Sequence, residues 1–407
     1  MTTTDTSIPA SIPASIRVAV VGNCPADLWG ISSAERISRQ LRAIGPYRLS
    51  GEAEAVASAE PALFLRADYL FDDRTLADLL AAEGTVLRAG SDADAPVVAV
   101  RADKNRASAA LEAVKGAGTW RNDPNWRVET AASLSAAYNR KLRKASPPQL
   151  WAIRSDRVNE LEAALFGNSY KGVTDLVTKF VWPRPAKLVT KFCSQHGISP
   201  NTVTSASLVL TALATVLFAY GWFLTGLVLA WIMTFLDTVD GKLARVTVTS
   251  TTFGNIFDHG IDIVGPPVWY VAWAYGLPDS SFDAGIDRVT LFGMILGGYL
   301  VGRMVEGSFD RGLAGFQIFV WRPLDSWFRL IIARRNPNLI FLTAFALAGL
   351  PLVGLYAVAA WTVLCSVFLV GRLALAIRQR RADGSLQPWL RAPTAADLSS
   401  PLARPFL

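Results

Sequence analysis

Long runs of apolar residues are confined to the second half of the chain. Residues 17–160 mix short apolar runs with charged residues, whereas residues 205–380 hold nearly all of the long apolar stretches. A helix needs about 20 consecutive apolar residues to cross the core of a bilayer. The pattern therefore predicts a soluble N-terminal domain followed by a membrane domain.

The soluble part alternates predicted strands with predicted helices. Strand-like runs cover 17–23, 62–66 and 96–101, and helix-like runs cover 32–45, 73–84 and 107–118. The first helix opens at Ser32, has Glu35 three residues later as in a capping box, and is followed by Gly45. This alternation predicts a small α/β domain with a parallel, doubly wound sheet.

Six apolar stretches follow, and they predict an α-helical integral membrane domain of six transmembrane helices. The stretches cover 205–223, 224–236, 256–277, 289–305, 339–350 and 353–376. The loop 303–338 carries six Arg against three acidic residues, and basic loops stay on the cytosolic side of a membrane. We therefore expect both termini in the cytosol, and a bacterial or archaeal inner membrane as the location.

Changes in composition divide the chain into five segments. They are a disordered tail over 1–16, the soluble domain over 17–145, a basic linker over 146–204, the membrane domain over 205–380 and a flexible tail over 381–407. Within the linker, cations interleave with apolar side chains over 170–191. This predicts a juxtamembrane amphipathic helix at the headgroup surface, broken at Pro183 and Pro185. The alternative is an ordinary amphipathic helix packed on the soluble domain.

The overall composition excludes several kinds of protein and site. Of the 407 residues, 51 % are hydrophobic and 18 % are charged, which disfavours a wholly soluble protein. The 3 Cys and 2 His are too few for a disulfide framework or a His-rich metal site. The formal net charge of +7 favours an anionic membrane surface and phosphorylated substrates over nucleic acid as partners.

Four carboxylates stand where the second and third apolar stretches meet. Asp237 and Asp240 are three residues apart, and Asp258 and Asp262 are four apart, so on helices each pair shares one face. At about 5 Å and an effective dielectric of about 20, two carboxylates repel by roughly 3 kcal/mol. A divalent cation would relieve this repulsion. An all-oxygen ligand set favours Mg²⁺ or Mn²⁺, as one or two ions, with Ca²⁺ as an alternative.

The acids and the residues between them form a recognisable motif. The pattern D-x-x-D-G-x-x-A-R-x(8)-G-x(3)-D-x(3)-D is filled at Asp237, Asp240, Gly241, Ala244, Arg245, Gly254, Asp258 and Asp262. It resembles the motif of the CDP-alcohol phosphotransferase (CDP-alcohol phosphatidyltransferase) family of membrane enzymes. The resemblance covers about residues 170–380 and includes the sequence PNTVT at 200–204.

This resemblance implies a reaction and a role for each motif residue. Such enzymes cleave the pyrophosphate of a CDP-alcohol, transfer the phospho-alcohol to a hydroxyl group and release CMP. By the resemblance, Asp237, Asp240 and Asp258 bind metal, while Asp262 bridges two ions and acts as the general base. The residues implied in CDP binding are Gly241, Ala244, Arg245, Gly254, Asn201 and Thr204.

Basic residues near the ends of the later stretches indicate where an acceptor could bind. Arg303 and Arg372 each follow a glycine, and Arg334 and Arg335 precede the fifth stretch. This arrangement is similar to the inositol-phosphate-using branch of the family, so the implied acceptor is a polar alcohol such as inositol phosphate. The alternative for all four is a cytosolic anchor at the membrane surface.

A soluble domain ahead of such a membrane domain resembles the bifunctional inositol-phosphate cytidylyltransferase/phosphotransferases. Asp68 is similar to their strand-end aspartate, but their glycine-rich loop with Arg and Pro-Lys is missing, and only Gly22 and Gly30 remain. Backbone amides need glycine to wrap closely around a triphosphate. The prediction is a degenerate nucleotidyltransferase-like domain without that activity, in which Cys24 is a buried apolar thiol.

The leading hypothesis is a metal-dependent membrane phosphotransferase of phospholipid biosynthesis that uses CDP-diacylglycerol or another CDP-alcohol and forms a homodimer through its membrane helices. One alternative is a CDP-inositol-using phosphotransferase of the bifunctional type. A second, from another class, is a divalent-cation transporter with the acidic cluster as its ion path. A third is a scaffolding protein whose N-terminal domain is the functional part.

Overall fold

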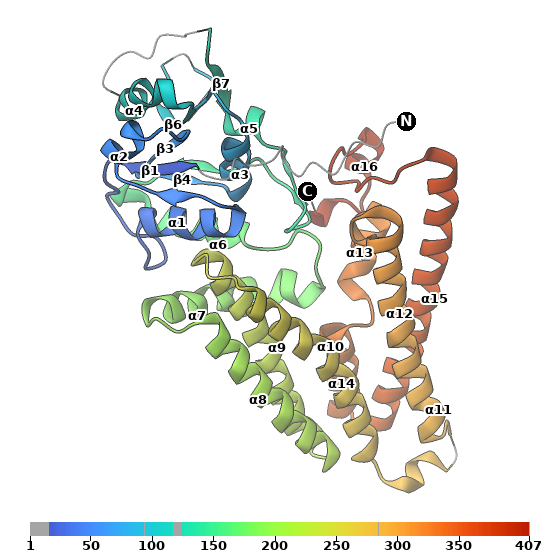
Figure 1. Cartoon of the computed structure of the whole chain (residues 1–407). Helices are drawn as coiled ribbons and strands as arrows, with labels where there is room; N and C mark the ends of the chain where they lie inside the picture. Colours follow the sequence, from blue (N-terminus) through green and yellow to red (C-terminus); the bar gives the residue numbers. More distant parts are fainter. Residues whose placement is uncertain (1–15, 93, 117–123, 284, 407) are drawn as a thin grey trace. The chain divides into compact units, whose positions relative to one another are not determined.

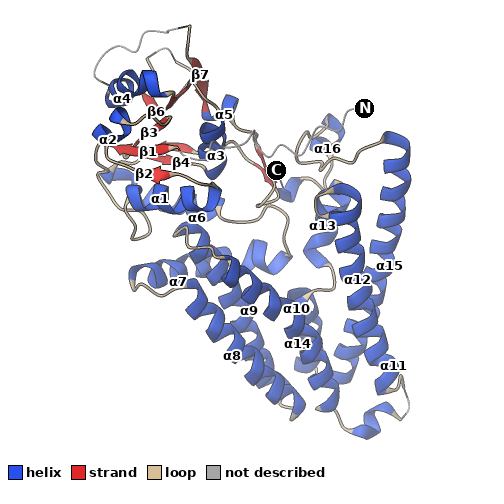
Figure 2. Cartoon of the chain, in the orientation of Figure 1, coloured by secondary structure: helices blue, strands red, loops and turns tan. Residues whose placement is uncertain are grey.

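The computed structural model describes residues 16–92, 94–116, 124–283 and 285–406 (Figure 1). The chain forms two compact units, one made of residues 1–139 and 146–165 and the other of residues 140–145 and 166–407. The tail predicted over 1–16 lies outside the described residues except for Ile16. Strands are confined mostly to the first unit, and the second is almost entirely helical (Figure 2).

A six-stranded sheet forms the centre of the first unit, in the order β2-β1-β3-β6-β5-β7. Its strands are β1 (Arg17–Val21), β2 (Arg48–Leu49), β3 (Ala62–Arg66), β5 (Thr85–Arg88), β6 (Val97–Ala102) and β7 (Arg127–Thr130). β1 pairs in parallel with β2 and β3, and β5 pairs in parallel with β7, but β6 runs antiparallel to both β3 and β5, so the sheet is mixed rather than parallel throughout as predicted. The reason is the short connection from Arg88 to Val97, because a parallel crossover needs a dozen residues or more.

Helices and a small ribbon complete the first unit. The helices are α1 (Ser33–Ile44), α2 (Glu52–Ala57), α3 (Asp73–Ala81), α4 (Ala107–Lys115), α5 (Ala131–Leu134) and the start of α6 (Val158–Asn168). Strand β4 (Tyr69–Phe71) pairs antiparallel with β10 (Leu150–Ala152), and β8 is Tyr138–Asn139. The helix predicted over 32–45 is confirmed, since Ser32 accepts a hydrogen bond from the backbone N–H of Glu35 at 3.3 Å. Leu63 and Phe64 belong to separate hydrophobic clusters, so both faces of the sheet are covered.

The second unit consists of helices, the longest of which lie side by side in Figure 1. They are α7 (Pro183–Gln195), α8 (Pro200–Ala219), α9 (Phe223–Val246), α10 (Thr252–Tyr275), α11 (Arg288–Phe292), α12 (Gly298–Gly307), α13 (Pro323–Ile331), α14 (Arg335–Leu347), α15 (Pro351–Asp383) and α16 (Ala395–Ser399), with β9 at Lys144–Ala145. α8 packs against α9 and α10, and α15 packs against α12 and α14. Phe218, Trp269 and Trp273 are fully buried between α8 and α10.

Among the described residues of this unit, four helical stretches are long and apolar enough to cross a membrane. They are Pro200–Ala219, Phe223–Val246, Arg288–Ala314 and Pro351–Asp383. The other two predicted spans correspond to α10, which carries Asp258 and Asp262, and to α14, which has only 13 residues. The count of six spans therefore stays a prediction.

The break predicted at Pro183 and Pro185 is confirmed only at the first proline. A short helical segment over Val177–Val181 ends at Trp182, and α7 begins at Pro183. Pro185 breaks no helix, since it lies in the first turn of α7. The first N–H groups of a helix have no partner within it, so proline is tolerated there.

The C-terminal segment is packed against the helical unit around Trp389. The Trp389 N–H donates to the Val320 carbonyl at 3.1 Å, and its indole Nε1 donates to the Ser326 hydroxyl at 2.9 Å. The side chains of Trp389 and Leu390 are buried. This part of the expected flexible tail therefore has a defined place on α13.

A close contact between backbones holds the end of α10 against the turn between α8 and α9. A Cβ atom added to Gly276 would lie 1.9 Å from the carbonyl oxygen of Phe218 and 2.8 Å from the nitrogen of Gly221. Backbone atoms cannot move aside as a side chain can. Only glycine at position 276 allows these helices to pack as they do.

We expect Gly276→Ala to lower the stability of the purified protein by roughly 1–3 kcal/mol, the usual cost of overpacking. Gly293→Ala is the matched control, since nothing lies within 4 Å of a Cβ atom there. Thermal unfolding in detergent measures both variants. Equal melting temperatures for the two would contradict the packing argument.

Candidate functional site

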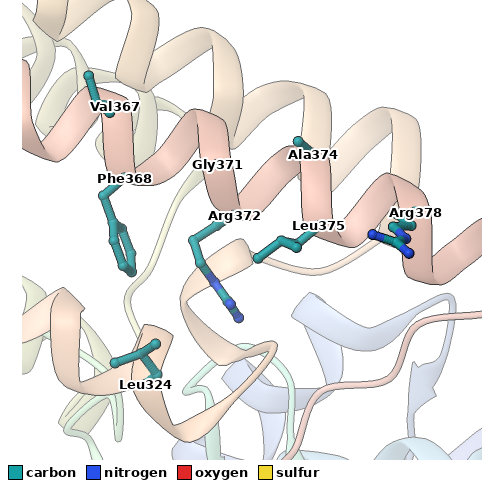
Figure 3. A pocket seen from close by; sticks show the side chains of 8 residues that line it. All are labelled: Leu324, Val367, Phe368, Gly371, Arg372, Ala374, Leu375 and Arg378. Atoms are coloured by element: carbon teal, nitrogen blue, oxygen red, sulfur yellow. The ribbon is translucent and has the colours of Figure 1, made fainter.

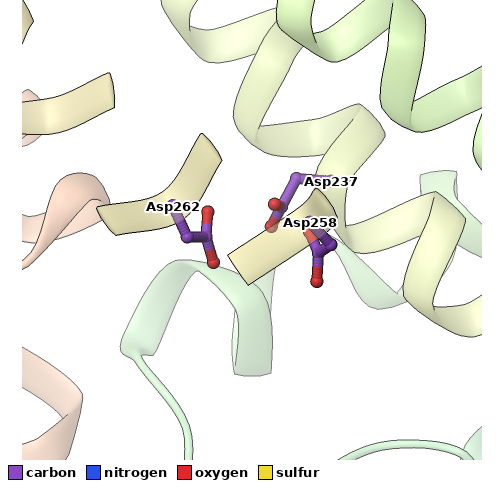
Figure 4. Close-up of side chains that lie close together, drawn as sticks. All are labelled: Asp237, Asp258 and Asp262. Carbon is purple, nitrogen blue, oxygen red and sulfur yellow. The ribbon is translucent and has the colours of Figure 1, made fainter. Parts of the chain in front are cut away.

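Three of the four predicted acids converge between two neighbouring helices. Asp237 projects from α9, and Asp258 and Asp262 project from α10 (Figure 4). One carboxylate oxygen of each lies within 4.8 Å of the others. The four-residue spacing of Asp258 and Asp262 thus places both on one side of α10 and toward Asp237, whereas the three-residue spacing of Asp237 and Asp240 does not bring that pair together.

Asp240 occupies a separate, more buried position one turn further along α9. It is 3 % exposed, and its Oδ2 accepts a hydrogen bond of 2.5 Å from the hydroxyl of Thr204 on α8. Its other oxygen, Oδ1, is buried and has no hydrogen-bond partner. A buried carboxylate oxygen without a partner is costly, so this atom is suited to accept a further donor or to coordinate a cation.

Arg335, the first residue of α14, is the fixed cation of this acidic group. Its Nη2 lies 2.6 Å from Asp237 Oδ2, and its Nη1 pairs with Asp262. The side chain is only 12 % exposed. Arg335 was predicted to bind the acceptor; its pairing with Asp237 has no local signal in the sequence, because the two residues are 98 positions apart.

The donor set matches that expected for a hard divalent cation. Three carboxylates share one space, and Asp240 adds a buried oxygen nearby that no hydrogen bond satisfies. Oxygen-only ligands of this kind suit Mg²⁺ or Mn²⁺. The residues that would hold such an ion are Asp237, Asp258 and Asp262, with Asp240 beside them.

The two motif glycines lie where neighbouring groups come close. A Cβ atom on Gly254 would lie 2.8 Å from Asn201 Oδ1 and 3.0 Å from the Thr251 hydroxyl, which caps α10. A Cβ atom on Gly241 would lie 3.1 Å from Arg245 Nη2. The N-terminal ends of α8 and α10 therefore meet beside the acids, and glycine permits this approach.

Arg245 carries an unused donor in this region, because its Nε is buried without a hydrogen-bond partner. Ala244, its neighbour on α9, is half-buried. The predicted CDP-binding residues are thus distributed over α8, α9 and the start of α10.

The four basic residues predicted for acceptor binding are not gathered in one group. Arg303 of α12 and Arg334, which caps α14, share Glu306, at 2.9 and 2.5 Å. Arg335 pairs with the acids instead. Glu306, one turn after Arg303, was not considered in the sequence analysis, although its i,i+3 spacing indicates such a pair.

Arg372 lies apart from this group, on α15. It forms a bidentate ion pair with Asp325 of α13 at 2.6 and 2.8 Å, and Asp325 is 2 % exposed. Its side chain also borders a groove of about 690 Å³ together with Leu324, Phe368 and Leu375 (Figure 3). In this arrangement the Arg372 guanidinium is engaged in joining α13 to α15.

In the N-terminal unit, the segment that would hold a nucleotide loop is filled by side chains. Leu28 and Trp29 are buried, and the Trp29 N–H donates to Glu162 Oε1 at 2.9 Å. Asp68 pairs with Arg66 at 2.6 Å. Cys24 is half-buried rather than buried, and burial raises the pKa of its thiol.

Comparison with known proteins supports the assignment of the motif region. Residues 197–298 match the family model of CDP-alcohol phosphatidyltransferase. Cholinephosphotransferase 1 of Danio rerio is 40 % identical over 79 residues, which is 16 % of this chain and 20 % of that protein.

Two archaeal proteins match a longer segment. The archaetidylinositol phosphate synthase of Aeropyrum pernix is 28 % identical over 130 residues, which is 32 % of this chain and 63 % of the relative. The enzyme of the same name from Pyrococcus horikoshii is 31 % identical over 119 residues, 28 % of this chain and 50 % of the relative. The chain thus covers between a fifth and about three fifths of the length of these relatives.

We expect Thr204→Val to destabilise the protein by about 1–3 kcal/mol and to weaken Mn²⁺ binding, because Asp240 would lose its one hydrogen-bonded side-chain partner. Thr215→Val is the control, since the Thr215 hydroxyl bonds only to the backbone of its own helix. Melting temperature and Mn²⁺ titration report the two effects. Identical behaviour of both variants would argue against a role for Thr204 in orienting Asp240.

Proposed function

We propose that the protein is a membrane phosphotransferase of phospholipid biosynthesis, on the ground that residues 197–298 match the family model of CDP-alcohol phosphatidyltransferase. It transfers the phospho-alcohol part of a CDP-alcohol to a hydroxyl acceptor and releases CMP. The observation that carries the proposal is the convergence of Asp237, Asp258 and Asp262 from two helices of the matched segment.

The acids divide the chemical work according to their surroundings. Asp237, Asp258 and Asp262, with Asp240 beside them, would hold a Mg²⁺ or Mn²⁺ ion, which would supply positive charge to stabilise the reacting pyrophosphate. Asp262 is the most accessible of the converging acids, with a side chain 43 % exposed, and it also takes the proton of the acceptor hydroxyl as general base.

The remaining motif residues position the nucleotide. Gly241, Ala244 and Gly254 leave space for the cytidine part. Arg245 offers its unpartnered Nε to a phosphate oxygen. Asn201 borders this space beside Gly254, and Thr204 acts through its hydrogen bond to Asp240.

The acceptor we propose is a phosphorylated polyol, and inositol phosphate is the first candidate. The names of the two archaeal relatives contain inositol phosphate. Arg303 and Arg334 converge on a single acid, Glu306, so one positive charge is left in excess in this pair. A phosphate group would balance it. Arg335 pairs with Asp262, the proposed general base, and so adds a positive charge next to it.

We propose CDP-diacylglycerol as the donor, because the domain has helices long enough to hold a lipid substrate within the bilayer. The proposed topology has six spanning helices, with both termini and the site in the cytosol. In it, α10 and the short α14 are the two further spans beside the four long apolar stretches. α14 packs against both α9 and α15, in keeping with this placement. A homodimer through the membrane helices and an N-terminal domain without nucleotidyltransferase activity complete the proposal.

The test is release of CMP by the purified full-length protein from CDP-diacylglycerol with Mg²⁺ or Mn²⁺ and a panel of alcohols, including inositol phosphate and inositol. CDP-inositol replaces the donor in a parallel series. Removal of divalent cations with EDTA should abolish the reaction, and added Mn²⁺ should restore it. Metal flux into proteoliposomes without any dependence on CDP compounds would instead support the transporter alternative.

We expect Asp262→Asn to reduce the rate of CMP release at least 100-fold, since a general base contributes about 10²–10⁴-fold, while binding of the CDP-alcohol is retained. Asp279→Asn is the control, because that carboxylate is 91 % exposed outside the acidic cluster. Turnover of Asp262→Asn at the unmodified rate would remove Asp262 as base.

A further inference from the structure

Residues 140–145 form a strap that belongs to the helical unit, although they precede α6 in the chain. Arg140 donates to the carbonyl of Gly315, and the carbonyl of Leu142 accepts from the N–H of Gly172 at 2.8 Å. Lys144 Nζ donates to the carbonyl of Asn168 at 2.8 Å. Hydrogen bonds from three of its residues therefore hold the strap against the helical unit.

The backbone of the strap fits closely against the turn that follows α6. A Cβ atom on Gly172 would lie 2.6 Å from the Arg143 carbonyl oxygen and 2.6 Å from the Cβ of Lys144. Arg143 itself has a φ of 51°, in the left-handed region that residues other than glycine seldom adopt. Such a conformation persists only where the surrounding contacts impose it. The contacts of the strap therefore fix the backbone of Arg143 in this conformation.

The side chain of Arg143 reaches the neighbourhood of the Arg303–Glu306–Arg334 group. Its Nη1 donates to Gln317 Oε1 at 2.5 Å. Two residues further along the chain, the buried ring of Phe319 lies against the guanidinium groups of Arg329 and Arg334, at 5.6 and 5.9 Å. A series of contacts therefore connects Arg143 of the strap with Arg334, which pairs with Glu306.

Positive charge exceeds negative charge in this place, even with the neighbouring acids of the acidic cluster included. The cations are Arg143, Lys171, Arg245, Arg303, Arg329 and Arg334, and the acids are Glu306, Asp175, Asp258 and Asp262. Arg329 Nη1 and Arg334 Nε are buried without a hydrogen-bond partner. Burial, together with the neighbouring guanidinium groups, lowers the pKa of Lys171 to about 7. Crowded cations with unused donors are stabilised by an anion that accepts from several of them.

We propose that the 140–145 strap completes a phosphate-binding pocket of the helical unit, in which Arg143 binds a phosphomonoester and so selects phosphorylated over unphosphorylated acceptors. The proposal rests on the proposed function for the identity of that ligand as an acceptor. None of the strap residues lies within the matched segment 197–298. The first stretch of the N-terminal unit ends at Asn139, and the strap begins at the next residue, Arg140. The N-terminal unit is therefore joined directly to the segment that we propose contacts the acceptor.

The test measures binding rather than turnover. Full-length protein in detergent is titrated with myo-inositol 1-phosphate, with inorganic phosphate and with myo-inositol by calorimetry. We expect Arg143→Gln to weaken myo-inositol 1-phosphate binding about tenfold and to leave the weak binding of myo-inositol unchanged. Arg143→Lys should restore part of the loss, since it keeps the charge but not the planar fork of donors.

Lys141→Gln is the matched control, because it removes the same charge from an exposed position of the same strap. Its binding should stay within twofold of the unmodified protein. Gly172→Ala, which displaces the strap without removing a charge, should weaken binding as Arg143→Gln does. Equal losses in Lys141→Gln and Arg143→Gln, or no loss in Arg143→Gln, would overturn the proposal.

Two further arms separate this pocket from its alternatives. Displacement of the probe by phosphatidylglycerol in nanodiscs, but not by inorganic phosphate, would assign the pocket to a lipid headgroup and overturn the acceptor role. CMP release is followed in the same preparations. If it is absent with every donor while the Arg143 effect on binding persists, the proposed function fails and the phosphate pocket stands.

Discussion

The repulsion between carboxylates inside the helical bundle is the interaction on which the rest of the site depends. Asp237, Asp258 and Asp262 lie within 4.8 Å of one another, where each pair opposes the fold by roughly 3 kcal/mol at an effective dielectric of about 20. Arg335 offsets part of this by pairing with two of them. The start of α14 is therefore tied to α9 and α10 by charge, and a divalent cation at the same acids would bind there for the same reason.

Close packing keeps the charged groups from separating. Thr204 holds Asp240 to α8, Gly254 lets α10 approach Asn201, and Gly276 lets the far end of α10 rest on the turn after α8. These contacts act at both ends of α10, so its acids cannot move away from α9 without loss of packing along the whole helix. The chemistry proposed for the acids requires that rigidity, because bound phosphates and a proton acceptor must keep fixed distances.

In the N-terminal unit, local sequence patterns correctly predicted where a helix begins. They did not predict the direction of a strand, which depends on the length of the loop before it. Ser32 and Glu35 correctly located the start of α1, since a cap depends on a few adjacent residues. The direction of β6 was wrong, because it depends on the length of the link from Arg88 to Val97 rather than on the apolar character of the strand. Pro183 does stand where one helical segment ends and α7 begins, whereas Pro185 was misjudged, since it falls within the first turn of α7.

The sequence by itself determined that Asp258 and Asp262 would share one side of a helix, because helical periodicity acts over a few residues. It also carried, within a single pair of helices, the motif whose region matches the family model of CDP-alcohol phosphatidyltransferase over residues 197–298. Only the tertiary structure decided which cation meets these acids, that Glu306 joins Arg303 to Arg334, and that the 140–145 strap belongs to the helical unit. Those contacts join residues far apart in the chain, and no local periodicity encodes which of many arginines will reach a given carboxylate.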